Sequence, residues 1–220
     1  MATIELLDEH LINQIKAGEV VESPHSMLKE LIENSIDAKS TELKIVIKNN
    51  GLDLVQIRDN GLGISFNQLP LAFARHATSK IKKFGDIYQV YSYGFRGEAL
   101  ASISSVAKVN LISQPENSIE SGKIIIHGGE VLNHESSKTK INGTVISVEN
   151  LFYNTPARLK FLKSNRTLRN QLNQVIYSFI LTQPTIHFTI QFDSDEPFVF
   201  EPIKPGIDAR SLRAKQLVSI

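Results

Sequence analysis

The sequence has no cysteine and no tryptophan among its 220 residues. The absence of cysteine excludes disulfides and thiolate metal sites, and it is compatible with a cytoplasmic protein. No run of about 18 apolar residues is present, so the sequence predicts no membrane-spanning helix. The first residues carry acids early and lack an apolar core followed by a small-residue cleavage site, unlike a signal peptide. We therefore expect a cytoplasmic location.

An excess of charge of one sign is also missing. Lysine and arginine number 24 against 23 aspartates and glutamates, which gives a net charge of +1. Whole-molecule charge therefore does not indicate a nucleic-acid binder, and such a role would need a local basic patch. The sequence also lacks a GxxxxGK[ST] motif, so a P-loop does not hold any bound phosphates.

The patterns of apolar residues predict helices and strands in an irregular order. Ser23 and Pro24 suit the cap and first turn of a helix, and Asn49, Asn50 and Gly51 suit a turn. Helices are expected over 9–18, 24–37, 67–75, 96–105 and 166–182. Strands are expected over 44–48, 54–59, 108–113, 123–135 and 144–152, with a closing hairpin of 186–193 and 197–202. This order favours an α+β sandwich, with helices covering one face of a mixed sheet.

The sequence predicts one main domain over residues 1–205. The residues after it, DARSLRAKQLVSI, continue a helical pattern that is still apolar where it stops. Because a domain end is usually polar or frayed, we expect residues 206–220 to begin a linker or second domain.

The stretch ELIENSIDA (30–38) belongs to a helix with two unlike sides. Its apolar side carries Leu28, Leu31, Ile32, Ser35 and Ile36, and its polar side carries Glu30, Glu33, Asn34 and Asp37. An Asn amide oxygen suits Mg²⁺, and a Glu one turn away can polarise a water molecule. The alternative is that the polar side is only a solvated helix face.

The segment DNGLGI (59–64) follows an apolar strand and contains two glycines. Gly61 and Gly63 permit positive φ and a close approach of the backbone to a ligand. Asp59, at the end of the strand, is placed to accept a hydrogen bond from an exocyclic amine. The alternative is an ordinary hairpin turn, since Asn-Gly is a strong turn signal.

Two further segments suit phosphate binding. In YGFRGEALASI (93–103), Gly94 and Gly97 flank Phe95 and Arg96 just before a helix, where free backbone N–H groups can hold phosphate. In HATSKI (76–81) three side chains can contact phosphate: Thr78, Ser79 and Lys80. The alternatives are an ordinary loop and a helix cap.

A basic stretch runs from Asn154 to Asn170 without an acid. It contains Arg158, Lys160, Lys163, Arg166 and Arg169. Such a patch can contact a nucleic-acid backbone. The alternative is a solvated face on two helices.

Taken together, the motifs form a specific series: NQIKAGEVVESP, KELIENSIDA, IRDNGLGI, RHATSKI, YGFRGEALASIS and LFYNTPARLKFL. This series resembles the N-terminal ATPase region of the MutL family of DNA mismatch repair proteins, over roughly residues 4 to 205. The MutL family belongs to the GHKL ATPases, with DNA gyrase, heat-shock chaperones and histidine kinases. The resemblance implies a two-layer α/β sandwich with a mixed, mostly antiparallel sheet and helices on one face.

The resemblance also implies roles for single residues. Glu30 matches the general base, Asn34 the Mg²⁺ ligand, and Asp59 the residue that recognises the adenine amino group. Thr144 matches the threonine near the base and the Asp59-linked water. The rest of the implied ATP site consists of Gly61 and Gly63 at the adenine, Thr78 and Lys80 in the lid region, and Gly94, Phe95, Arg96 and Gly97 in the phosphate loop. One departure lies nearby: Lys39 stands where the family usually has glycine.

The resemblance finally implies an ATP-driven switch that dimerises, engages a MutS-type mismatch-recognition protein and contacts DNA in the full-length protein, at bacterial repair sites. The family's second domain supplies a lysine to the γ-phosphate, so we expect this chain alone to bind ATP and turn it over slowly. Two alternatives stay open: a nucleotide-binding module without turnover, and the ATPase component of a type II topoisomerase. The FYNTPAR segment argues against the second.

Overall fold

The computed structural model describes residues 21–75, 77, 93 and 97–218. The helices are α2 (Pro24–Asp37), η1 (Asn49–Gly51), η2 (Phe66–Gln68), α3 (Leu69–Ala72), α4 (Ala99–Val106), α5 (Pro156–Lys160), α6 (Asn165–Thr182) and α7 (Ala209–Val218). The strands are β1 (Glu42–Lys48), β2 (Leu54–Asp59), β3 (Lys108–Gln114), β4 (Ser121–His127), β5 (Glu130–Ser137), β6 (Gly143–Glu149), β7 (His187–Phe192) and β8 (Phe198–Phe200).

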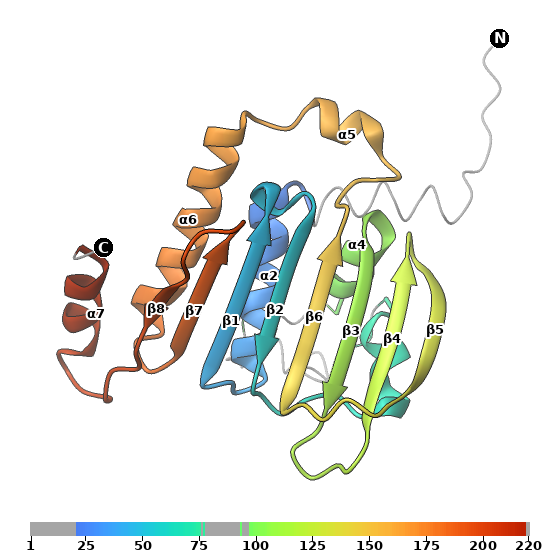
Figure 1. Ribbon diagram of the computed structural model, residues 1–220, viewed down its shortest axis with the longest axis horizontal. Helices are drawn as coiled ribbons and strands as arrows, with labels where there is room; N and C mark the ends of the chain where they lie inside the picture. Colours follow the sequence, from blue (N-terminus) through green and yellow to red (C-terminus); the bar gives the residue numbers. More distant parts are fainter. Residues whose placement is uncertain (1–20, 76, 78–92, 94–96, 219–220) are drawn as a thin grey trace, which may run out of the picture.

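These strands form a single eight-stranded sheet, in the order β5-β4-β3-β6-β2-β1-β7-β8 (Figure 1). Neighbouring strands pair antiparallel except β1 and β7, which pair parallel. The expected mixed, mostly antiparallel sheet is confirmed.

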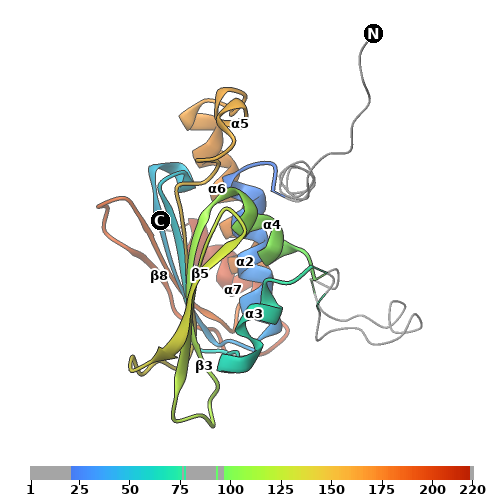
Figure 2. The same ribbon diagram turned by 90° about the vertical axis from the view of Figure 1, so that its right-hand side faces the viewer.

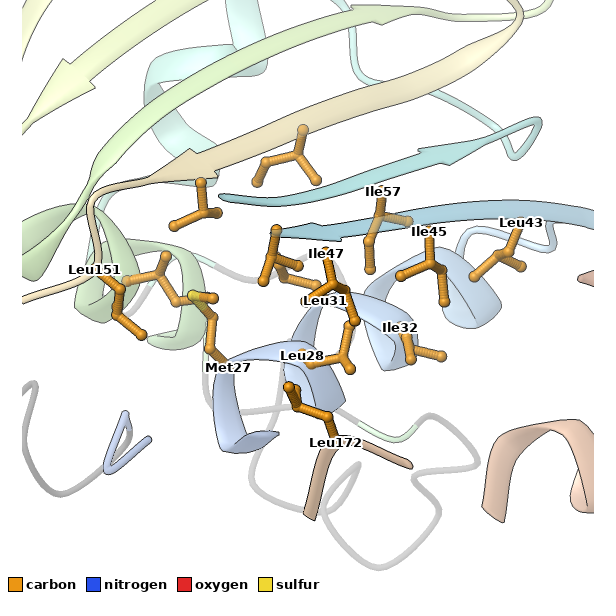
Figure 3. Packing of buried hydrophobic residues seen from close by; sticks show 14 of the residues in the cluster. Met27, Leu28, Leu31, Ile32, Leu43, Ile45, Ile47, Ile57, Leu151 and Leu172 are labelled. Carbon is orange, nitrogen blue, oxygen red and sulfur yellow. The ribbon is translucent and has the colours of Figure 1, made fainter. Parts of the chain in front are cut away.

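The helices α2, α3, α4, α6 and α7 cover one face of the sheet (Figure 2). Strand residues alternate between this covered face and the opposite one, as the period of two requires. The core between the layers includes Met27, Leu28, Leu31 and Ile32 from α2, Leu43, Ile45 and Ile47 from β1, Ile57 from β2 and Leu172 from α6 (Figure 3). The expected two-layer sandwich is therefore confirmed.

Helix α2 begins where the sequence predicts. Ser23 is the N-cap in extended conformation, its side chain accepts from the Ser26 N–H, and Pro24 follows at the first helical position. Proline suits that position because its missing N–H would have no partner inside the helix. Just beyond the C-terminus, Lys39 adopts a φ of 64°. Glycine adopts that left-handed conformation freely, whereas a lysine adopts it only with strain.

Two expected elements differ from the structure. The single strand predicted over 123–135 is a hairpin of β4 and β5, and it turns at Gly128 and Gly129, whose φ angles are 59° and 90°. Two consecutive glycines at positive φ are a hairpin signal that the apolar run obscured. The helix predicted over 67–75 is the short η2 followed by one turn of α3. The helix predicted over 9–18 lies outside the described residues.

Helix α7 packs against the end of α6 through a buried arginine. Arg213 has no exposed surface, and its guanidinium donates to the backbone oxygens of Pro184 (2.6 Å) and Ile186 (3.0 Å). These two residues lie in the segment that connects α6 to β7, so the Arg213 side chain holds α7 against that segment. No helix in the described ranges has the length and apolarity to cross a membrane.

Candidate nucleotide site

Three polar residues form a row across neighbouring strands at one end of the sheet. Asp59 of β2 pairs in register with Thr144 of β6, and Thr144 pairs with Ser113 of β3. Asp59 and Ser113 are buried, and Thr144 is half-buried. Buried polar groups are costly unless they are hydrogen-bonded, so each of the three residues needs a partner in the protein or in a ligand.

Both carboxylate oxygens of Asp59 accept hydrogen bonds. The Gly61 N–H donates to Oδ1 at 2.9 Å, and the Ser35 hydroxyl of α2 donates to Oδ2 at 3.0 Å. Burial raises the pKa of Asp59 above its ordinary 3.8, while hydrogen bonds from Gly61, Ser35 and Thr144 act in the opposite direction. The carboxyl group is thus held in one orientation, with acceptor capacity left for a ligand.

The loop after Asp59 lies between α2 and β3. A Cβ on Gly61 would meet the Ala38 oxygen at 2.7 Å, and a Cβ on Gly63 would meet the Gln114 oxygen at 2.3 Å. The Leu62 N–H donates to Ala38 O at 2.8 Å, which ties the loop to the end of α2. The chain then continues into η2, so the hairpin-turn alternative for this segment is wrong. Both glycines permit close packing of backbone on backbone.

The polar side of α2 is not a fully solvated face. Glu30, Asn34 and Asp37 are half-buried. Glu33 is buried, with 6% of its surface exposed, and its carboxylate lies 3.1 Å from the Lys29 ammonium in an ion pair. Glu30 and Asn34 lie one helical turn apart, as predicted.

Tyr93 connects this side of α2 to the glycine segment that follows it in the sequence. Its backbone N–H donates to Asp37 Oδ1 at 3.1 Å. Its ring packs edge-on against Phe179, and its hydroxyl accepts from Gln183 Nε2 at 2.9 Å. The start of the predicted phosphate segment is therefore anchored beside the polar side of α2.

Several predicted site residues lie outside the described residues: Thr78, Lys80, Gly94, Phe95 and Arg96. Their roles stay predictions. Gly97 is described, and its φ of 64° requires the conformational freedom of glycine. It stands just before α4, so the expected glycine at a helix N-terminus is present.

The described residues contain no group of three or more His, Cys, Asp or Glu side chains suited to a metal ion. An all-protein metal cage is therefore not built from them. An amide oxygen is a hard donor that suits Mg²⁺, so the Asn34 side chain fits a role as one ligand of such an ion.

The basic stretch divides into paired and exposed charges. Arg169 lies 3.4 Å from the Phe192 ring centroid and within 3.7 Å of Asp193 and Asp195, so it is a packing residue. Arg158 is half-buried beside the Phe152 ring. The exposed charges of this surface are Lys160, Lys163 and Arg166.

Sequence reasoning missed two serines of the site. Ser35 was placed on the apolar side of α2, and Ser113 occupies a buried position in the alternating strand KVNLISQ. A polar residue at a position that the period assigns to the core is the signal that could have found both.

Comparison with known proteins shows the family to which the chain belongs. The family model described as histidine kinase-, DNA gyrase B- and HSP90-like ATPase matches residues 21–150. The solved structure of the Aquifex aeolicus MutL ATPase domain complexed with ADP is 30% identical, with a TM-score of 0.69, and the match covers 91% of this chain and 70% of that chain. The chain belongs to this ATPase family, as a domain of the MutL type.

Curated relatives agree with this membership. The DNA mismatch repair protein MutL of Histophilus somni is 47% identical over 188 residues, which cover 86% of this chain and 31% of the relative. That of Streptococcus equi subsp. equi is 44% identical over 196 residues, 89% of this chain and 30% of the relative. The MutL-type domain thus spans about a third of the length of the curated relatives it matches.

An open hollow also lies between β8 and α7. It is lined by residues that include Phe200, Ile203, Leu212 and Lys215. None of the nucleotide-site residues lines it, so it takes no part in the site.

Proposed function

We propose that this domain binds and hydrolyses ATP within a MutL-type DNA mismatch repair protein. The observation that carries the proposal is Asp59, a buried carboxylate with both oxygens held and further acceptor capacity beside two close-packed glycines. An acceptor in this position selects an exocyclic amine such as that of adenine. The ADP complex of the Aquifex aeolicus relative supports a nucleotide of this class.

Helix α2 provides the groups for hydrolysis. Glu30 is half-buried on the polar side, where it orients and deprotonates the attacking water. Asn34, one turn later, would hold Mg²⁺, which would neutralise phosphate charge. Such a site needs little covalent chemistry, because positioning and electrostatics supply most of the catalysis of phosphoryl transfer.

The phosphates are expected to lie at the glycine segment before α4. Gly97 leads directly to the free N–H groups of that helix, and Tyr93 anchors the other side of the segment to Asp37. Gly94, Phe95 and Arg96 complete the proposed cradle, with Thr78 and Lys80 in the lid region.

The full-length protein is proposed to be an ATP-driven switch. Its proposed partners are a second copy of itself, through ATP-dependent dimerisation, a MutS-type protein and DNA. Its proposed location is the cytoplasm, at the bacterial nucleoid. Turnover by this chain alone is expected to be slow, because the resemblance places a γ-phosphate lysine in a following domain. Equal turnover rates for this chain and a longer one would contradict that expectation.

Calorimetric titration with Mg²⁺ and a non-hydrolysable ATP analogue tests the adenine site. Asp59→Asn replaces one acceptor oxygen with a donor, so we expect its Kd to rise at least about tenfold over that of the parent. Asp53→Asn, on the exposed turn of the β1–β2 hairpin, is the matched control and should bind as the parent does. Equal binding by the parent and Asp59→Asn would exclude this reading of the pocket.

A further inference from the structure

Ser113 lies at the end of the polar row, and none of the recognised motifs includes it. It has no exposed surface, although it stands one residue before the end of β3. Three polar groups lie within hydrogen-bond distance of its hydroxyl: the Ile64 N–H at 2.7 Å, Thr144 Oγ1 at 2.8 Å and the Gly143 carbonyl oxygen at 3.1 Å. One buried hydroxyl therefore joins the loop after Asp59 to strand β6.

The numbers of donors and acceptors decide how these three contacts share one proton. A serine hydroxyl has one proton and two lone pairs. The Ile64 N–H can only donate and the Gly143 oxygen can only accept. All three contacts are satisfied together when Ser113 donates to Gly143, and accepts from both Ile64 and Thr144. A buried arrangement that satisfies every group is favoured over one that does not.

This arrangement fixes the polarity of Thr144. Its hydroxyl proton is directed to Ser113, so only its oxygen lone pairs remain for a ligand. Thr144 stands next to Asp59 in the register of β2 and β6. The two neighbouring side chains then both present acceptors.

The geometry points to Ser113 as a positioning residue that makes the site selective for 6-amino purines over 6-oxo purines. It acts through Thr144, by holding the threonine hydroxyl as an acceptor, and through Ile64, by holding the loop. This inference rests on the proposed function, because it assumes that the base lies beside Asp59. A purine with a carbonyl oxygen at position 6 brings an acceptor against the two acceptors of Asp59 and Thr144, and acceptors do not pair with one another.

The experiment compares the Kd of ADP with that of inosine diphosphate, which carries an oxygen in place of the 6-amino group. In Ser113→Ala the Thr144 hydroxyl is released and can turn to donate. We expect the preference for ADP over inosine diphosphate to fall about threefold to tenfold, as the loss or reversal of one hydrogen bond implies. If Ser113 were only structural, the affinities for both nucleotides would fall by one factor, and that result would overturn the inference.

Controls separate this result from general destabilisation. Ser105→Ala removes another buried serine hydroxyl, which donates within α4 to Ser102 O, and should keep the parent's preference. If Ser113→Ala does not fold, Ser113→Cys keeps the shape with a weaker donor and acceptor, and a smaller loss of preference is expected. An unchanged preference in a folded variant contradicts the inference alone. Failure of the parent to bind ADP contradicts the proposed function, and the inference with it.

Discussion

Helices α2 and α6 lie on the same face of the sheet, but their polar sides differ. Each packs an apolar side into the core, with Leu31 from α2 and Leu172 from α6 both buried. The polar side of α6 exposes Gln174, Tyr177 and Ser178. The polar side of α2 is half-buried or buried, although it is rich in carboxylates.

This difference shows what marks a site in an amphipathic helix. Apolar periodicity describes both helices equally well, because it reports only which side enters the core. Burial of carboxylate and amide groups costs free energy without a compensating partner. Because the polar side of α2 is half-buried or buried, the proposed function rests on it, while the exposed polar side of α6 needs no function.

The largest expected effect is on the rate of ATP hydrolysis and comes from a substitution in α2. In the full-length protein, Glu30→Gln should lower the rate of ATP hydrolysis at least about hundredfold, because the general base is lost. The Kd for the nucleotide should stay within about threefold of the parent value, since binding rests on other groups. Glu33→Gln, on the same helix, is the control and should retain turnover. An active Glu30→Gln would exclude the proposed base.

A smaller effect is expected from the basic surface where α6 begins. Lys163→Glu with Arg166→Glu should weaken DNA binding by the full-length protein and reduce the slope of log K against log salt by about 2, one for each lost phosphate contact. The control is Lys44→Glu with Lys48→Glu, an equal charge change on the exposed positions of β1. If both pairs change the salt slope equally, the α6 surface is only a solvated face.

The smallest effect concerns pH and the carboxylate beneath α2. Burial raises the pKa of Asp59 in the folded state, so folding favours its protonated form. Its contribution to the free energy of unfolding therefore falls as pH rises from the ordinary value of 3.8 through the raised one. Asp59→Asn should remove this fall, as measured by denaturant titrations between about pH 4 and about pH 7. Asp53→Asn should retain it; a parent-like pH slope in Asp59→Asn would contradict the prediction.

Much of the fold could be predicted from the sequence because its signals are local. The cap at Ser23, the turn at Asn49–Gly51 and the alternation in β1 and β2 all act within a few residues. The β4–β5 hairpin was missed because an apolar run read as one continuous strand across its glycine turn. Local patterns also do not specify which strands pair, so the position of β6 between β3 and β2 needed the structure.

A candidate site could be proposed where a motif carries the chemistry. The structure places Asp59 beside Thr144 at one end of the sheet, with Gly61 and Gly63 in the loop that follows Asp59. Their roles at a nucleotide stay predictions. Ser35 and Ser113 act through contacts with residues distant in sequence, so no local pattern specifies their partners. Residue spacing could suggest that they were unusual, but not what they bind.

The parallel pairing of β1 with β7 has a consequence for synthesis of the protein. Residues 42–48 can pair with β2 at once, but their other edge is completed only by residues 187–192. At about 5–20 residues per second, the ribosome leaves that edge open for on the order of ten seconds. The strand carries Leu43, Ile45 and Ile47, all buried in the finished domain. An apolar strand with an open edge is prone to aggregation, so the nascent chain has a period of risk that ends when β7 is made.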